Sequence, residues 1–331
     1  MMVREHMLSR REILLGAITT GAAGFFRRLS EVFAKASQPQ TKVNFEIPSG
    51  ACDCHVHVFG DPGRFPFAAT RGYTPEAASI DELRSLHGAL HIDRVVVVQP
   101  SVYGTDNACT LDAIRQLGNR ARGIAVIDER TPDAMLDEIA RAGIRGIRLN
   151  LAQAGITDPP AARRQFQTAF ERVKARNWHI QINTQPRVIE AIGDVLSTSP
   201  VPLVFDHFGG ATAAAGVEQS GFGTLVNLVK MGRAYVKISA AGDGMSAAKP
   251  DYSDVTPFAK ALVAANPQRI LWGTNWPHPD AVPRPGRENT DLAPLLQTDD
   301  GHILNLIAIW VPDAATRRMI LVENPARLYG F

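Results

Sequence analysis

Eight short runs of apolar and β-branched residues recur along the chain, and longer amphipathic stretches separate most of them. Such runs are typical of buried strands, and the stretches between them carry helix-start signals, such as Ser79 and Glu82 in a capping box. Eight strands alternating with helices predict an α/β fold, a single-domain (β/α)8 TIM barrel, because a doubly wound sheet usually has fewer strands. The predicted strands cover residues 51–58, 94–99, 122–128, 144–150, 179–183, 202–207, 234–239 and 269–275.

Length and composition fit one large hydrophobic core. The chain has 331 residues, of which 45% are hydrophobic and 21% are charged. It contains no run of about 18 or more apolar residues, so we expect no permanent membrane span. We therefore assign residues 51–331 to the barrel and residues 37–50, which are mostly polar, to a linker.

Residues 1–36 have the pattern of an export signal. Arg10 and Arg11 precede an apolar stretch rich in Gly, Ala and Thr, and residues 34–36 form a small-x-small cleavage site. We expect a twin-arginine-type signal peptide, a periplasmic mature protein and no stable membrane association once the signal is removed. The alternative is an ordinary amphipathic helix with an accidental pair of arginines.

The positive charge of the chain lies mainly in this leader. Residues 1–36 hold six Lys and Arg and three Asp and Glu, which leaves 29 basic and 30 acidic residues in the remainder. The mature chain is near neutral and shows no basic stripe with interleaved aromatic residues. We therefore expect a small-molecule partner and no nucleic acid.

Polar residues gather at the ends of the predicted strands. Barrel enzymes place their chemistry at the carboxyl ends of the strands, so this pattern predicts an active site there. Loops also begin at strand ends, but that explains poorly why three histidines and an arginine are among these residues. The polar residues are His55, His57, Gln99, Ser101, Asp128, Arg148, Asn150, Asn183, His207, Ser239 and Asn275.

The histidines indicate either a metal site or a group that polarises a carbonyl. Strand alternation places Asp53, His55 and His57 on one face, which we expect to point into the barrel, and His207 would add a third imidazole from across it. Three imidazoles suit zinc, which would polarise a carbonyl and bring the pKa of a bound water to about 7. Without a metal, the imidazoles would polarise the same carbonyl more weakly.

Other polar residues near the same rim suit the binding of an anion. Arg148 ends its strand, and its forked donors fit a carboxylate or a sulfonate, although a surface salt bridge is the usual fate of an arginine. Tyr73 and Ser101 lie on loops at the same rim and would donate hydrogen bonds. Together these residues predict a site for an anionic substrate.

A set of ordered motifs resembles the amidohydrolase superfamily, whose members have metal-dependent-hydrolase-type barrels. The set is similar to the branch that holds 2-pyrone-4,6-dicarboxylate hydrolase, 4-sulfomuconolactone hydrolase and D-galactarolactone isomerase. The motifs run from about residue 52 to the C-terminus and read CDCHVHVFG, RGYTP, QPSVYGTDNACTLDAI, ARGIAVID, GIRGIRLN, VFDHFG, WGTNWPHP and LVENPARLYGF.

The resemblance implies a role for each matching residue. Catalytic roles fall on His55, His57, His207 and Asn275, and the three histidines would also be the ligands of a zinc ion, although a metal-free site occurs in this branch. Substrate-binding roles fall on Tyr73, Ser101 and Arg148.

Three departures from the branch pattern argue against the pyrone dicarboxylate as substrate. Asn275 stands where the pyrone hydrolase has an aspartate that activates water, Ala154 replaces a second arginine, and residues 236–244 offer no third. Each missing guanidinium removes a contact of about 1.5 to 3 kcal/mol. Because an amide takes no proton near pH 7, a metal-free site would need His207 or His278 as the base.

The expected function is hydrolysis of an anionic monocyclic lactone of the muconolactone type, with 4-sulfomuconolactone as the best single candidate, in the degradation of aromatic compounds. Three alternatives stay open. They are isomerisation of a sugar-acid lactone through the substrate's own hydroxyl, hydrolysis of 2-pyrone-4,6-dicarboxylate, and binding of a lactone without catalysis.

Overall fold

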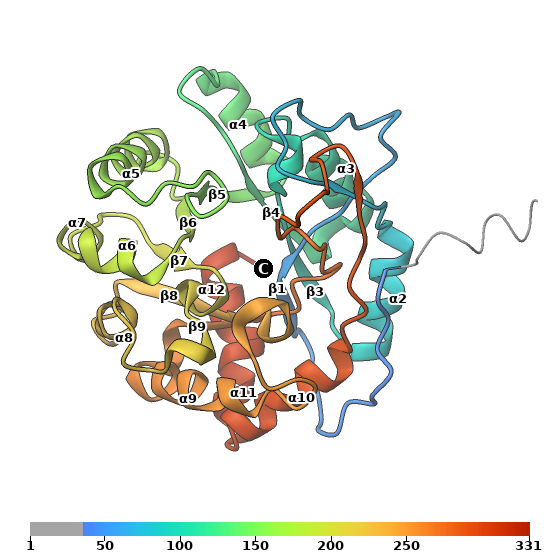
Figure 1. Ribbon diagram of the computed structural model, residues 1–331, viewed down its shortest axis with the longest axis vertical. Coiled ribbons are helices and arrows are strands. Elements are labelled where there is room, and N and C mark those ends of the chain that lie inside the picture. Colours follow the sequence, from blue (N-terminus) through green and yellow to red (C-terminus); the bar gives the residue numbers. More distant parts are fainter. Residues whose placement is uncertain (1–35) are drawn as a thin grey trace, which may run out of the picture. The chain divides into compact units, whose positions relative to one another are not determined.

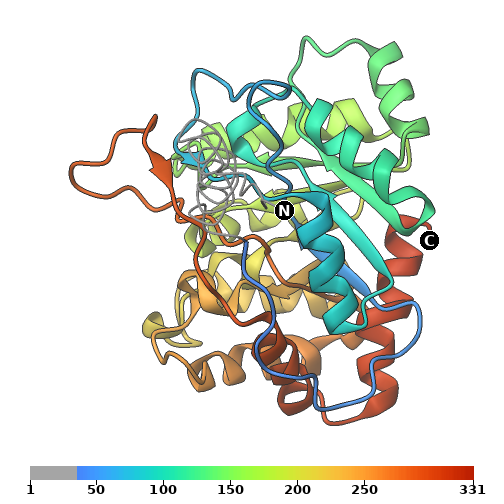
Figure 2. The same cartoon turned by 90° about the vertical axis from the view of Figure 1, so that its right-hand side faces the viewer.

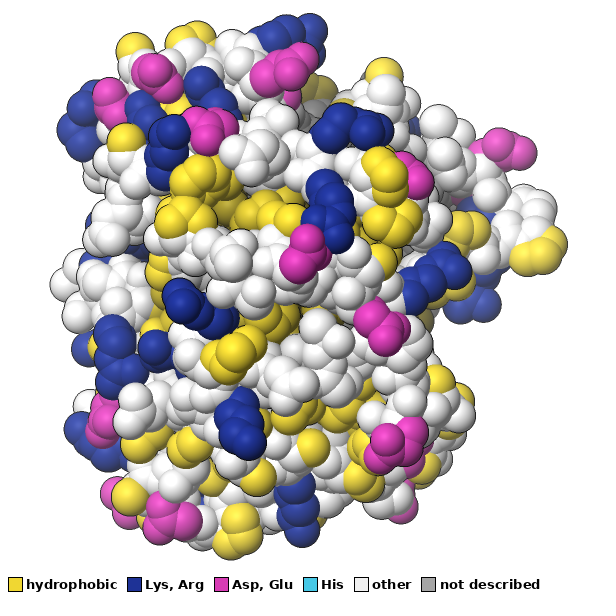
Figure 3. Space-filling view, turned by 90° about the vertical axis from the view of Figure 1, so that its left-hand side faces the viewer, with side chains coloured by type: hydrophobic (Ala, Val, Ile, Leu, Met, Phe, Trp, Pro, Cys, Tyr) yellow, Lys and Arg dark blue, Asp and Glu magenta, His cyan; other side chains and the backbone are white. Residues whose placement is uncertain are grey.

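The computed structural model describes residues 36–331, which form one compact unit. The predicted signal peptide lies outside the described residues, apart from Ala36. No helix between residues 36 and 331 is both long and apolar enough to span a membrane. On the face shown in Figure 3, basic and acidic side chains are interspersed, and neither sign forms a continuous patch.

The central element is a sheet of eight parallel strands surrounded by helices (Figure 1). Each strand pairs with the next strand of this sheet along the chain, and every predicted strand is confirmed. Their high content of valine and isoleucine suits strands that are buried on both faces. The strands are β1 (Cys52–Val56), β3 (Arg94–Val98), β4 (Ala121–Ala125), β5 (Ile144–Asn150), β6 (His179–Asn183), β7 (Leu203–Phe205), β8 (Ala234–Ser239) and β9 (Ile270–Gly273).

The first and last strands of this sheet meet and nearly close it into a barrel. Val56 and Trp276 form a parallel bridge beyond the end of β9. The backbone N–H of His57 donates to the carbonyl of Trp276 at 2.8 Å, and that of Asn275 donates to the carbonyl of His55 at 2.9 Å. The architecture is a parallel α/β barrel that agrees with the predicted TIM barrel, and its closing bonds lie within the predicted site.

Helices fill the intervals between the strands. The predicted capping box is confirmed at α2, where the Ser79 hydroxyl accepts from the Glu82 N–H at 3.2 Å and the Glu82 carboxylate accepts from the Ser79 N–H at 2.8 Å. The helices are α2 (Ile80–Leu90), α3 (Ala108–Leu117), α4 (Asp133–Arg141), α5 (Pro159–Val173), α6 (Pro186–Ala191), α7 (Gly193–Ser197), α8 (Phe222–Lys230), α9 (Thr256–Ala265), α10 (Asp300–Trp310), α11 (Ala314–Arg318) and α12 (Asn324–Tyr329).

Two apolar layers hold the barrel together. The larger layer lies between the strands and the helices, and the smaller one fills the barrel interior. Tyr329 of α12 belongs to the interior layer together with Cys52, Cys54 and Val96, so the C-terminal helix covers one end of the barrel. Buried aliphatic, aromatic and thiol groups therefore occupy that end, and polar groups occupy the other.

A β-bulge in β1 corrects one prediction. The register with β3 shifts between Asp53 and Val56, so strict alternation of side chains fails there. Cys54 joins the interior layer, whereas Asp53 contacts the Thr274 hydroxyl at 2.6 Å and His87 of α2 at 3.4 Å. The expectation that Asp53 faces the barrel interior is therefore wrong.

Two rim segments that lie far apart in the sequence pair above the polar end. The short strands β2 (Thr74–Pro75) and β10 (Leu292–Ala293) run parallel and hydrogen-bond to each other. Figure 2 shows the long segment before β10 projecting on the same side as β2. Residues 36–50 contain no helix or strand and lie along the barrel, where the Ser37 carbonyl accepts from the Trp276 indole at 3.1 Å.

Candidate active site

A cavity of about 380 Å³ opens at the carboxyl ends of the strands. His55 is fully buried and lies against His57, one of the residues in its wall. The structure therefore brings all seven predicted site residues together, although they come from four strand ends and two rim loops. Six of them line the cavity, namely His57, Tyr73, Ser101, Arg148, His207 and Asn275.

His57 is held as a neutral imidazole with a defined tautomer. Its Nδ1 lies 2.8 Å from the carbonyl oxygen of Val98, which only accepts hydrogen bonds, so Nδ1 carries the proton. Burial, reinforced by the charge of Arg148, lowers the pKa of His57 to about 3. Its Nε2 therefore presents a bare lone pair near neutral pH.

The Nε2 atoms of His55 and His57 face each other at 3.3 Å. On its other side, His55 Nδ1 lies 3.2 Å from the Asp206 carboxylate and 3.3 Å from the Lys237 ammonium. Burial lowers the pKa of His55 well below its usual value. Since two bare lone pairs at this distance repel, either a proton on His55 Nε2 or a cation is needed between the rings.

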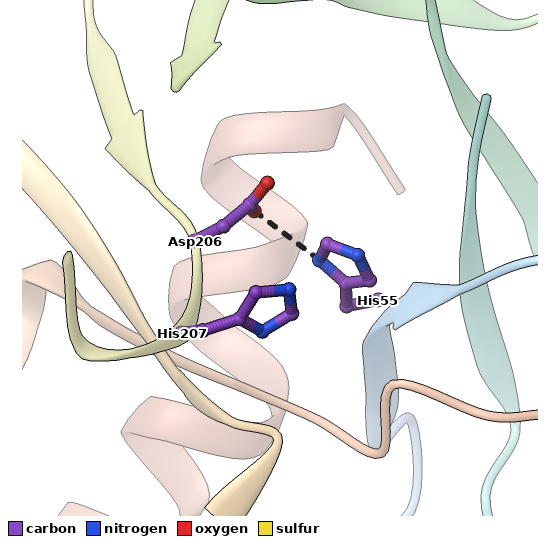
Figure 4. Close-up of side chains that lie close together, drawn as sticks. All are labelled: His55, Asp206 and His207. Atoms are coloured by element: carbon purple, nitrogen blue, oxygen red, sulfur yellow. Dashed lines mark ion pairs between the residues drawn. The ribbon is translucent and has the colours of Figure 1, made fainter. Parts of the chain in front are cut away.

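His207 approaches the same point from the end of β7. Its positive φ of 48° turns the chain, so that Asp206 and His207 both face His55 although they are consecutive (Figure 4). The ring centroids of His55 and His207 are 4.5 Å apart, and His207 Nδ1 lies 2.9 Å from the Ser239 hydroxyl. Burial lowers the pKa of His207 to about 4, so this imidazole is also neutral at pH 7.

These donors fit a zinc ion. Each of the three imidazoles uses Nδ1 for a bond within the protein, the arrangement that orients histidine ligands of metals. Two nitrogens bound to one tetrahedral zinc ion lie about 3.3 Å apart, which matches the Nε2–Nε2 distance of His55 and His57. Within residues 36–331, the one group of His, Cys, Asp and Glu side chains close enough to share an ion is His55, Asp206 and His207. This group does not include His57, and its Asp206 carboxylate lies at His55 Nδ1, whereas His57 lies at His55 Nε2.

A buried charge network lies beside these imidazoles. Asp206 accepts from Arg148 Nε at 3.0 Å and from the Gln181 amide at 3.1 Å, and its other oxygen lies 3.4 Å from Lys237 Nζ. Burial alone would raise the pKa of Asp206, but the positive groups around it hold that pKa well below its usual value. With neutral imidazoles, two cations face one carboxylate, and this excess of positive charge suits an anionic ligand.

Arg148 is positioned to bind that ligand. Its Nε donates to Asp206, and within residues 36–331 no other residue accepts a hydrogen bond from its guanidinium, which lines the cavity. Tyr73 is buried beside Arg148 and Ser101, and burial raises the pKa of its phenol to about 12. The phenol is therefore a neutral hydrogen-bond donor at pH 7.

Asn275 lines the cavity, and His278 lies buried three residues later in the same segment. Both have positive φ, 71° and 58°, so the chain after β9 is held in a conformation that few non-glycine residues adopt. The Asn275 amide donates to Asp243 at 2.9 Å. His278 contacts Asp243 and Asp300, and these carboxylates raise its pKa well above its usual value although burial opposes the change. A protonated His278 takes up no proton, which removes it as the base of a metal-free site.

Several of these residues were missed by reasoning from the sequence. Lys237 lies in the middle of the run AYVKIS, where a charged residue inside an otherwise buried strand was an available signal. Asp206 directly precedes a predicted site histidine, and strand alternation alone would place it on the opposite face from that histidine. Asp243 and Asp300 lie in loop and helix-start segments without a motif, so the sequence held no signal for them.

Known proteins resemble this chain over most of its length. The Amidohydrolase family model matches residues 52–331. A 4-sulfomuconolactone hydrolase of Rhizobium radiobacter is 36% identical over 293 residues, which cover 87% of this chain and 92% of that protein. A 2-pyrone-4,6-dicarboxylate hydrolase of Comamonas testosteroni is 32% identical over 305 residues, or 90% of this chain and 94% of that one.

A solved structure gives the same result. The crystal structure of a probable 2-pyrone-4,6-dicarboxylic acid hydrolase from Acinetobacter baumannii, with citric acid bound, superposes with a TM-score of 0.70 at 26% identity. It covers 85% of this chain and 100% of that one. The chain belongs to the amidohydrolase family.

Proposed function

We propose that this protein hydrolyses an anionic monocyclic lactone of the muconolactone type, and that 4-sulfomuconolactone is its substrate in the degradation of aromatic compounds. The observation that carries the proposal is the cavity itself. Neutral imidazoles and the guanidinium of Arg148 meet in a space of about 380 Å³, which suits a small ring with an acidic substituent. Two 4-sulfomuconolactone hydrolases, 36% and 34% identical to the chain, support this choice of substrate.

Arg148 would bind the acidic group of the lactone through its free guanidinium nitrogens. Lys249 and Arg284 also line the cavity, from the segments that follow β8 and β9, and would meet a second anionic group such as a sulfonate. The citric acid bound by the Acinetobacter baumannii protein shows that a relative accepts a small polycarboxylate. Tyr73 and Ser101 would donate hydrogen bonds to the ring oxygens.

We also propose that His55, His57 and His207 hold a zinc ion, as their donor geometry allows. Bound zinc would polarise the lactone carbonyl and lower the pKa of water. The Val98 carbonyl, Asp206 and the Ser239 hydroxyl orient the three rings whether or not the metal is present. Water adds to the carbonyl carbon, the bond to the ring oxygen breaks, and a ring-opened acid leaves.

A panel of lactones tests the proposal with purified protein comprising residues 37–331. We expect kcat/KM to be highest for 4-sulfomuconolactone and to fall at least about 100-fold in His57→Ala, because the substitution removes a group at the reacting carbonyl. His91→Asn is the matched control, since His91 is exposed at the C-cap of α2 and asparagine tolerates its left-handed backbone. Full activity in His57→Ala would contradict the site, and a wild-type protein inert toward every lactone would contradict the function.

We further propose that the protein acts in the periplasm after twin-arginine export. The proposal rests on Arg10 and Arg11 and on the small residues Ala34 and Ala36. Replacing both arginines by lysine should leave the unprocessed chain in the cytoplasm, whereas the wild-type chain should appear in the periplasmic fraction in a shortened form. Retention of the wild-type full-length chain in the cytoplasm would contradict it.

A further inference from the structure

A second buried cluster lies at the cavity wall, and the proposed lactone hydrolysis has so far given its residues no role. It consists of Asp243, which follows β8, His278, which follows β9, and Asp300 at the start of α10. His278 Nδ1 lies 2.7 Å from the Asp243 carboxylate, and its Nε2 lies 3.1 Å from that of Asp300. Asp300 and His278 are almost completely buried, whereas the Asp243 side chain is 12% exposed and lines the cavity.

The cluster keeps Asp243 ionised. Burial alone would raise the pKa of Asp243, but His278 and the Asn275 amide lower it below its usual value. Burial raises the pKa of Asp300, on the far side of the imidazole. The carboxylate of Asp243 therefore faces the cavity, and the buried imidazolium of His278 hydrogen-bonds to it on the side away from the cavity.

The carboxylate of Asp243 is hydrogen-bonded to Asn275, one of the residues in which the sequence differs from the pattern of the branch. An amide accepts no proton near pH 7, so Asn275 cannot do the work of an aspartate. Its Nδ2 instead donates to Asp243 Oδ2 at 2.9 Å, which places a carboxylate directly beside the amide. A carboxylate from the segment after β8 therefore lies beside the amide that follows β9, and both line the cavity.

We propose, on the basis of the proposed lactone hydrolysis, that Asp243 is the general base of the reaction and that Asn275 and His278 are the residues that position it. Both positioning residues donate to the same oxygen, Oδ2. The other oxygen, Oδ1, has one long contact, at 3.5 Å, with the Thr298 hydroxyl. Its lone pairs are therefore available to a water molecule in the cavity.

The step balances with water as the co-reactant. Asp243 Oδ1 takes a proton from water while the water oxygen forms a bond to the lactone carbonyl carbon and the carbonyl electron pair moves to its oxygen. The excess positive charge of Arg148 and Lys237 over Asp206 favours that oxyanion. The bond to the ring oxygen then breaks, and the carboxylic proton of Asp243 passes to that oxygen.

The assignment makes the rate depend on the protonation of Asp243. The ionisable groups that face it are His278 and Asp300 behind it, His207 across the cavity, Tyr252 from the segment before α9, and Lys249 in the wall. Because the carboxylate is the active form, kcat should fall as the pH drops through the pKa of Asp243. Removing the carboxylate should remove this acid limb of the pH profile.

Moving the carboxylate provides the test. In Asp243→Asn we expect kcat for the best lactone to fall about 100- to 1,000-fold with KM within a few-fold of wild type, and the acid limb to disappear. In the double variant Asp243→Asn with Asn275→Asp, which exchanges amide and carboxylate, we expect at least about tenfold recovery over the single variant. Asp313→Asn is the control, because Asp313 caps α11 and does not line the cavity.

Failure of the assignment of Asp243 and failure of the proposed function would give different results. Activity in Asp243→Asn within threefold of wild type, or an exchanged variant that folds and shows no recovery, would overturn the assignment of Asp243. If Asp243→Asn does not fold, Asp243→Glu, which keeps a carboxylate, should retain the acid limb, and its loss there would overturn the assignment. Absence of ring opening by the wild-type protein would instead overturn the proposed function.

Discussion

The site contains two clusters whose histidines differ in charge. The three imidazoles of the first cluster are neutral, whereas the single histidine of the second is protonated. The cluster of His55, His57 and His207 is buried beside cations, and all three imidazoles have pKa values below the usual range. His278, about as deeply buried, lies between two carboxylates and has a pKa well above that range. Burial lowers the pKa in both clusters, so the neighbouring charges decide the outcome.

Because of this difference in charge, the two clusters can take different parts in a reaction. Neutral imidazoles offer lone pairs to a metal ion or a proton, whereas the imidazolium offers none and instead holds a carboxylate in place. Beside the neutral imidazoles, Arg148 and Lys237 favour negative charge on a carbonyl oxygen, whereas the segments after β8 and β9 supply a carboxylate that can act as a base. A lactone bound in the cavity would have its carbonyl facing the imidazoles and the attacking water facing the carboxylate.

Removing the carboxylate that balances the cations beside the first cluster should have the largest effect on the free energy of unfolding. Asp206→Ala leaves Arg148 and Lys237 buried without their carboxylate, which we expect to lower the free energy of unfolding by about 3 to 5 kcal/mol. Asp300→Asn, in the second cluster, leaves Asp243 against His278 and should cost only about 1 kcal/mol. Urea denaturation measures both, and equal losses would contradict the difference between the clusters.

The pH dependence of stability should follow the neutral cluster. Folding lowers the pKa values of His57 and His207 from 6.5 to about 3 and about 4, so below pH 6.5 the unfolded chain binds protons that the folded chain does not. The free energy of unfolding should therefore fall as the pH drops toward about 4.5, by up to about 1.4 kcal/mol per pH unit for each of these histidines.

His278 does not oppose this trend in the same window. Its folded pKa is raised, so its contribution is complete below pH 6.5 and is lost only as the pH rises through the folded pKa. Urea titrations of the metal-free protein between pH 6.5 and 4.5 measure how steeply the free energy of unfolding changes with pH. His207→Asn should reduce this slope by the contribution of one histidine. A slope of zero in the wild-type protein would contradict neutral, buried imidazoles.

Zinc should stabilise only the first cluster. Adding the ion at about 100 times its dissociation constant should raise the free energy of unfolding by about 2.7 kcal/mol, seen as a higher Tm. His57→Ala should remove most of this gain, whereas Asp300→Asn should keep it, because Asp300 contacts no imidazole of that cluster. An unchanged Tm of the wild-type protein would contradict zinc binding at this cluster.

The smallest expected effect concerns one hydrogen bond. Ser239→Ala removes the hydroxyl at His207 Nδ1 and should cost about 1 kcal/mol of stability, together with about a tenfold loss of zinc affinity from a less well oriented ring. Calorimetric titration with zinc measures the affinity. Wild-type affinity in this variant would show that Ser239 does not orient His207.

The strands were predictable because each is a short apolar run with clear ends. Residues 144–150, 179–183 and 234–239 match β5, β6 and β8 without any shift. The direction of individual side chains was less predictable. The bulge between Asp53 and Val56 and the positive φ of His207 both break the alternation on which such predictions depend.

The convergence of the predicted site residues followed from one rule, that strand ends of a barrel share a rim. The second cluster did not follow from any rule. Asp243 and His278 are separated by 35 residues and meet only because the segments after β8 and β9 fold against each other. Lys237 and Gln181 were not predicted for another reason. Both lie inside strands, whose interiors are ordinarily apolar, and not at strand ends.

The most direct test of lactone hydrolysis is the fate of solvent oxygen. Purified protein comprising residues 37–331 would be incubated with 4-sulfomuconolactone in isotopically labelled water, and the product analysed by mass spectrometry. We predict a ring-opened acid that carries one solvent oxygen in its new carboxylate, formed by the wild-type protein and not by His57→Ala. An unlabelled, rearranged lactone, or an unchanged one, would contradict the account.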